Sequence, residues 1–144
     1  MQTVLDKHNI NLKEITMNPK IKEILETVKN NFNQYFIQVL KTQYFDYKGR
    51  SNLAQFWNYY LYSAVVGFII GLILGLLHIQ ILALIAGIAL FIPGICIGIR
   101  RLHDLGLSGL WYLIVFIPFI GSLSLLLMFS LPGEKSANAY GEAK

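Results

Sequence analysis

Charged residues are scarce in this chain. They make up 14% of its 144 residues, while 55% are hydrophobic. An ordinary soluble domain carries about 25% charged residues, and a soluble domain of this size could not bury so much apolar surface. A membrane protein can leave that surface facing lipid. The composition therefore indicates one integral membrane domain.

Cysteine is almost absent as well. Cys96 is the only one, which excludes an intramolecular disulfide and CxxC-type metal or redox chemistry. No basic patch marks a nucleic-acid partner. The first residues also lack the basic and then apolar pattern of a signal peptide. We therefore expect the membrane spans themselves to drive insertion.

Long apolar runs begin after a polar N-terminal region that covers residues 1–56. A single helix over 61–99 would be about 58 Å long, roughly twice the thickness of the hydrocarbon core, so this stretch must form two spans. We predict an all-α membrane protein with spans at 57–77, 81–99 and 111–131, followed by a polar tail at 132–144. A third run that is broken at Pro118 and re-entrant remains the alternative.

An amphipathic helix is predicted at 19–42, ahead of the first span. Asn18 can cap its start and Pro19 suits the first helical position. The apolar side chains from Ile21 to Leu40 fall on one face at 100° per residue. We expect this helix to lie on the membrane surface; packing on a partner is the alternative.

Basic residues predict the orientation of the chain. Residues 1–56 hold eight Lys or Arg, and Arg100 and Arg101 follow the second span. The positive-inside rule places both regions in the cytoplasm. In a three-span arrangement the N-terminus is then cytoplasmic and the C-terminus lies outside.

Two further groups of residues have roles suited to a membrane. Small residues spaced four apart allow close helix packing, against the second span or another protomer; they are Ser63, Gly67, Gly71 and Gly75. Aromatic residues near the ends of the spans are typical interface anchors; they are Trp57, Tyr59, Tyr60 and Trp111.

Polar residues at the predicted cytoplasmic ends of the spans form a candidate cluster, namely Asp46, Arg50, Arg100, Arg101, His103 and Asp104. Asp104 is placed to pair with Arg100 or Arg101 on one helix face. We expect structural ion pairs and contact with anionic lipid headgroups. One His beside one Asp is no metal site, and no paired nucleophile and base indicates catalysis. We expect no cofactor.

These motifs together resemble the domain of unknown function 805 family of small bacterial inner-membrane proteins. The resemblance rests on the order Gly49-Arg50, Arg100 to Asp104, Trp111, Pro118 to Gly121, and Asn138-Ala139-Tyr140-Gly141, and it runs from about 36 to 141. Leu53, Gln55 and Leu110 depart from the family pattern, and residues 1–35 are an extension. The resemblance implies a helical fold and an inner-membrane location, and it implies no activity.

Three functional hypotheses follow from these observations. The first is a non-enzymatic module that acts by helix packing, as a homo-oligomer or with a membrane-protein partner. The second is a small transporter or channel component, although the predicted spans lack the charges that transport sites usually contain. The third is an intramembrane enzyme, which the absence of a nucleophile and base disfavours.

Overall fold

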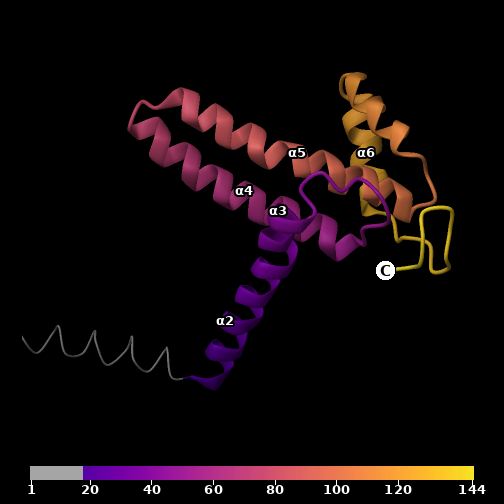
Figure 1. Ribbon diagram of the computed structural model, residues 1–144, viewed down its shortest axis with the longest axis horizontal. Coiled ribbons are helices and arrows are strands. Elements are labelled where there is room, and N and C mark those ends of the chain that lie inside the picture. Colours follow the sequence, from indigo (N-terminus) through magenta and orange to yellow (C-terminus); the bar gives the residue numbers. More distant parts are fainter. Residues whose placement is uncertain (1–17) are drawn as a thin grey trace, which may run out of the picture.

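Two long antiparallel helices form the body of the protein. The computed structural model describes residues 18–144, and in this part of the chain the regular elements are helices. Helix α4 (Leu53–Leu76) and helix α5 (Gln80–Asp104) lie side by side (Figure 1). The chain reverses at 77–79, where His78 adopts a positive φ of 57°. This reversal is where the hydropathy pattern predicted it.

Both helices are long and apolar enough to cross a membrane. Their apolar side chains face outward: only 6% of the most apolar window of α4 is buried, and 28% of that of α5. A core helix of a soluble protein would instead be mostly buried. The exposed leucines and isoleucines therefore suit a lipid environment.

Tyrosine hydroxyls from α4 and from the loop before it bind carbonyls of α5 near its proline. Pro93 has no N–H to donate to the carbonyl of Ala89, and that carbonyl accepts from the hydroxyl of Tyr44 at 2.8 Å. Tyr59 donates to the carbonyl of Leu90 at 2.8 Å. The helix consequently continues through the proline without leaving a carbonyl unpaired there.

Two of the four predicted interface anchors are therefore reassigned. Tyr59 is 1% exposed, and the Tyr60 hydroxyl donates to the carbonyl of Gly94 at 3.0 Å, so both tyrosines pack between α4 and α5. Trp57 and Trp111 are 38% and 48% exposed. Their depth in a bilayer stays a prediction.

A helical segment precedes the hairpin over the predicted range. It consists of α2 (Pro19–Phe32), the π-helical η1 (Asn33–Ile37) and α3 (Gln38–Thr42). The Asn18 side chain accepts from the backbone N–H of Lys20 at 3.0 Å, as an N-cap should. Figure 1 shows α2 leaving the α4–α5 hairpin at a steep angle.

The third apolar run does not form one span. It forms the 3-10 helix η2 (Gly109–Phe116), a reversal at 117–119 and the helix α6 (Ile120–Ser130). Each helix is roughly 16 Å long, about half of the hydrocarbon thickness. Phe119 turns the chain with a φ of 61°. The structure therefore has no single helix over the predicted span at 111–131, and the chain breaks beside Pro118, where the re-entrant alternative put the break; the position of this segment in the membrane stays a prediction.

This reversal also changes where the tail lies. Helix α6 returns the chain to the end of α5, where the backbone N–H of Glu134 donates to the carbonyl of Asp104 at 2.9 Å. A three-span arrangement would have put the tail at the opposite end of the hairpin from Arg50. The structure instead brings the tail and Arg50 together (Figure 1), so the two lie at one end of the hairpin.

The predicted glycine face is only partly used within one chain. A Cβ on Gly67 would contact Leu90 at 3.5 Å, whereas Gly71 and Gly75 have open space beside them. Successive residues four apart turn by about 40° around a helix, so Gly71 and Gly75 face progressively away from α5. Within one chain α5 therefore lies against Gly67 and not against Gly71 or Gly75, and for these two glycines the alternative of packing on another protomer stays a prediction.

Gly121 allows the re-entrant hairpin to close, because a Cβ there would overlap the backbone carbonyl of Ile114. We expect Gly121→Ala to lower the free energy of unfolding by about 1–3 kcal/mol through overpacking. Gly75→Ala is the matched control, since its site is open and alanine favours helix by roughly 0.5–1 kcal/mol. Chemical denaturation of both variants in detergent measures this, and equal stabilities would contradict the hairpin.

Candidate functional site

The six residues of the predicted polar cluster meet at one end of α5. Asp46 and Arg50 come from the loop between α3 and α4, and the other four occupy the last turns of α5. Arg50, Arg100, Arg101 and Asp104 are each at most 2% exposed. The structure thus brings the predicted residues together, and it buries these four side chains, whereas contact with lipid headgroups was expected.

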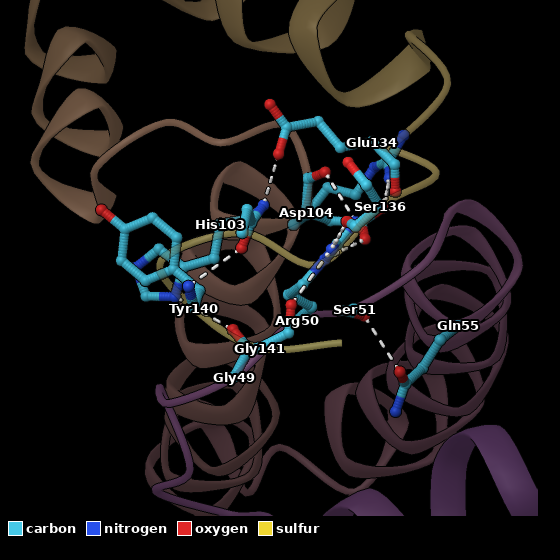
Figure 2. A network of polar contacts seen from close by, with 12 residues as sticks. Gly49, Arg50, Ser51, Gln55, His103, Asp104, Glu134, Ser136, Tyr140 and Gly141 are labelled. Carbon is cyan, nitrogen blue, oxygen red and sulfur yellow. Dashed lines mark hydrogen bonds and ion pairs between the residues drawn. The ribbon is translucent and has the colours of Figure 1, made fainter. Parts of the chain in front are cut away.

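Arg50 is the most completely paired side chain of the cluster (Figure 2). Its Nε donates to Asp104 Oδ1 at 2.9 Å. Its two Nη atoms donate to backbone carbonyls, which belong to Asp104, Glu134, Ser136 and Gly141. A guanidinium has five N–H groups, and Arg50 uses them all within the protein. We therefore withdraw the predicted headgroup contact of Arg50.

Asp104 is shared by two arginines. Its Oδ2 accepts from Nη1 of Arg101 at 2.5 Å, which is the ion pair predicted from the spacing of three residues. Arg101 also donates to the carbonyls of Phe129 and Leu131, and so pairs carbonyls at the end of α6.

Gly133 makes room for this carboxylate. A Cβ at Gly133 would overlap the carboxylate of Asp104. The Pro132-Gly133 step therefore has a second role besides ending the apolar run: it lets the tail pass directly over the ion pairs. The backbone of the tail can then supply the carbonyls that Arg50 needs.

His103 holds the tail from a second direction. Its Nδ1 lies 3.0 Å from the carbonyl of Gly49, a contact in which the ring nitrogen must donate. Its ring stacks on Tyr140 with centroids 3.9 Å apart, and its backbone carbonyl accepts from the Asn138 side chain at 3.0 Å. Tyr140 and Asn138 both belong to the Asn-x-aromatic-Gly motif at 138–141, to which the sequence alone assigned no role.

Arg100 stands apart from the other two arginines. Its Nη1 donates to Gln43 Oε1 at 2.8 Å and lies 3.6 Å from the half-exposed carboxylate of Asp46. Its Nε and Nη2 are buried without a hydrogen-bond partner.

The arrangement offers little for metal or nucleophilic chemistry. Among residues 18–144, no three His, Cys, Asp or Glu side chains are placed to hold a metal ion. The hydroxyl of Ser108, which lies close to His103 and Asp104 in the sequence, accepts from the backbone N–H of Leu110 and caps η2. Asp104 and His103 both make contacts that join separate segments of the chain.

Two apolar helices and a buried arginine–aspartate network at their end define a small helical membrane protein. Comparison with known sequences agrees with this class. The chain is 41% identical over 111 residues to "Inner membrane protein YhaI" of Escherichia coli (strain K12), covering 75% of this chain and 92% of that protein. It is 33% identical over 113 residues to "Inner membrane protein YhaH" of the same strain, covering 74% and 93%.

The chain belongs to the family described as "Protein of unknown function (DUF805)", which matches residues 44–142. This confirms the resemblance drawn from the motifs. The matched residues include the buried network, the re-entrant hairpin and the tail, whereas α2, η1 and α3 lie outside them. No solved structure matches the chain.

The shared carboxylate predicts strong coupling between Asp104 and its partners. Arg50→Ala should lower the free energy of unfolding by about 3–5 kcal/mol, because it leaves buried acceptors unpaired. The double variant Arg50→Ala/Asp104→Ala should cost less than the sum of the single variants, by about 0.5–3 kcal/mol. Lys48→Ala, an exposed lysine in the same loop, is the control. Denaturation in detergent measures all four, and strict additivity would contradict the network.

Proposed function

We propose that this protein is a non-enzymatic inner-membrane module that acts by binding. In this proposal α4 and α5 cross the membrane, the η2–α6 hairpin enters it from the cytoplasmic side, and α2 lies along the cytoplasmic surface. The buried network has a structural role, because it holds the loop before α4, the end of α5 and the tail as one unit.

The observation that carries the proposal is the direction of the apolar face of α2. Its inner end packs on α4: the ring of Phe32 lies 5.2 Å from that of Tyr62. Ile24, Leu25 and Val28 continue the same face outward and are 60%, 56% and 50% exposed. Because α4 is lipid-facing here, an apolar face that begins on α4 points toward the hydrocarbon.

Charge supports the same position for α2. Lys20, Lys22 and Lys29 lie on this helix, where they can reach anionic headgroups while the apolar face is immersed. The open positions Gly71 and Gly75 on α4 are where another helix could approach closely, from a second copy or another membrane protein. Binding to lipid and to helices thus accounts for both exposed surfaces.

The orientation follows from charge and from the position of the tail. Arg100, Arg101 and the basic N-terminal region belong to one end of the hairpin, and the positive-inside rule assigns that end to the cytoplasm. Because the tail contacts Arg50, both described ends of the chain are cytoplasmic in this proposal. This replaces the external C-terminus expected for three spans.

Cysteine labelling tests this orientation. In a Cys96→Ala background, single cysteines replace Lys48, His78 or Ser136, and intact cells are treated with a membrane-impermeant maleimide. We expect labelling at position 78 alone, with the other two positions reacting only after the inner membrane is opened. Labelling of position 136 in intact cells, with position 48 protected, would restore three spans and overturn the proposal.

An environment-sensitive fluorophore tests the position of α2. It is attached to a cysteine that replaces Val28, in the same background and in nanodiscs that contain phosphatidylglycerol. The emission should shift to the blue, because the apolar face is immersed. Glu26 on the opposite face is the matched control and should report water. Water-like emission from both positions would show that α2 does not lie on the bilayer.

A further inference from the structure

Arg100 is the one arginine of the cluster that has buried N–H donors without a hydrogen-bond partner. It is 1% exposed, yet only Nη1 has a hydrogen-bond partner, while Nε and Nη2 are buried and unpaired. Arg50, in contrast, donates to five acceptors. Buried donors without a partner are rare in folded proteins, and an ion or ordered molecule commonly explains them.

The charge at this end of the protein is also unbalanced. Three buried guanidinium groups, those of Arg50, Arg100 and Arg101, face one buried carboxylate, that of Asp104, which two of them already share. Asp46 is the remaining acidic partner, with a 44% exposed side chain at 3.6 Å from Arg100. The positive charge of Arg100 is therefore left with only a weak, solvent-screened partner.

A polar cleft of about 540 Å³ is lined by Gln43, the hydrogen-bond partner of Arg100, while Arg100 itself lies behind that lining. Side chains of Gln38, Gln43, Asn52 and Gln55 line it together with Lys144, and none of its lining side chains is acidic. The oxygen of Gln43 joins the two features, because it accepts from Arg100 at 2.8 Å and from Gln55 at 3.3 Å. Helix α4 also begins here, with no acidic residue in its first turn, so its dipole favours an anion.

We propose that Arg100 and this amide-lined cleft bind a phosphate group. Nε and Nη2 form one edge of the guanidinium, and two parallel N–H bonds on that edge match two oxygens of a phosphate. Gln43 accepts from Nη1 and lines the cleft, so it has to release Nη1 for the guanidinium to turn its Nε–Nη2 edge toward the anion. The amides of the cleft and Lys144 then donate to the other oxygens of the phosphate.

The phosphate belongs either to an anionic lipid headgroup or to a soluble phosphate. The lipid source rests on the proposed function, which puts this end of the protein at the cytoplasmic surface. The binding site itself does not rest on it, since a soluble anion could reach the cleft in any orientation. The test therefore separates the two sources.

The experiment follows the melting temperature of the purified full chain in neutral detergent. One arm adds inorganic phosphate, and the other adds short-chain phosphatidylglycerol with phosphatidylcholine as its reference. Stabilisation by phosphatidylglycerol alone identifies a lipid headgroup, and stabilisation by both identifies a site open to soluble phosphate. No stabilisation by either would overturn the proposal, since the unpaired donors would then bind only water.

Two variants assign the response to this site. Arg100→Gln should weaken the apparent affinity about fivefold or more, the effect of one basic residue near an anionic surface. Lys135→Gln removes the same charge from the exposed tail and should leave the affinity unchanged. An equal response in Arg100→Gln and the unaltered protein would place the anion elsewhere and overturn the proposal.

Gln55→Glu keeps the test decisive if Arg100→Gln does not fold. This nearly isosteric change puts a carboxylate into the cleft, where the Gln55 amide now donates to Gln43. The negative charge should repel an anion and abolish the response to it, while Arg100 is retained. A retained response would count against the site. Fluorescence from α2 is independent of these readouts, so failure here and failure of the proposed function are distinguishable.

Discussion

One carboxylate between two guanidinium groups determines how this end of the protein is built. Asp104 lies at the end of α5, and its partners Arg50 and Arg101 extend the contact to the loop before α4, to the last carbonyls of α6 and to the tail. Charges removed from water are costly unless nearly every hydrogen bond is made. The tail backbone meets that requirement for Arg50, so the tail is a structural part of the site.

Much of this arrangement can be predicted from the sequence. Hydropathy and length are sufficient for α4 and α5, because a run of apolar residues twice the bilayer thickness must fold back. The gathering of Arg50 with the residues from Arg100 to Asp104 follows once the two spans are antiparallel. The re-entrant run is harder to predict, since 111–131 has the length and hydropathy of a true span. Pro118 and Gly121 are compatible with a kink as well as with a reversal.

The role of the tail could not be predicted for a different physical reason. Arg50 binds Glu134, Ser136 and Gly141 through their backbone carbonyls, which every residue possesses, so the acceptors leave no side-chain signature. The usable signals are glycine and aromatic residues: Gly133 clears the space above Asp104, and Tyr140 stacks on His103. Tyr59 similarly fits an interface anchor by composition, and only its partner carbonyl across the hairpin shows otherwise.

The short η2–α6 hairpin gives the membrane domain an asymmetric cross-section. The helices η2 and α6 lie near the end of α5 that carries Asp104, whereas α4 and α5 continue alone to the opposite end (Figure 1). In a bilayer crossed by the α4–α5 hairpin as proposed, such a wedge would displace more lipid from one leaflet than from the other. In that arrangement the shape of the protein alone would change the area balance of the two leaflets, and the protein would fit best where the membrane already bends toward its narrow end.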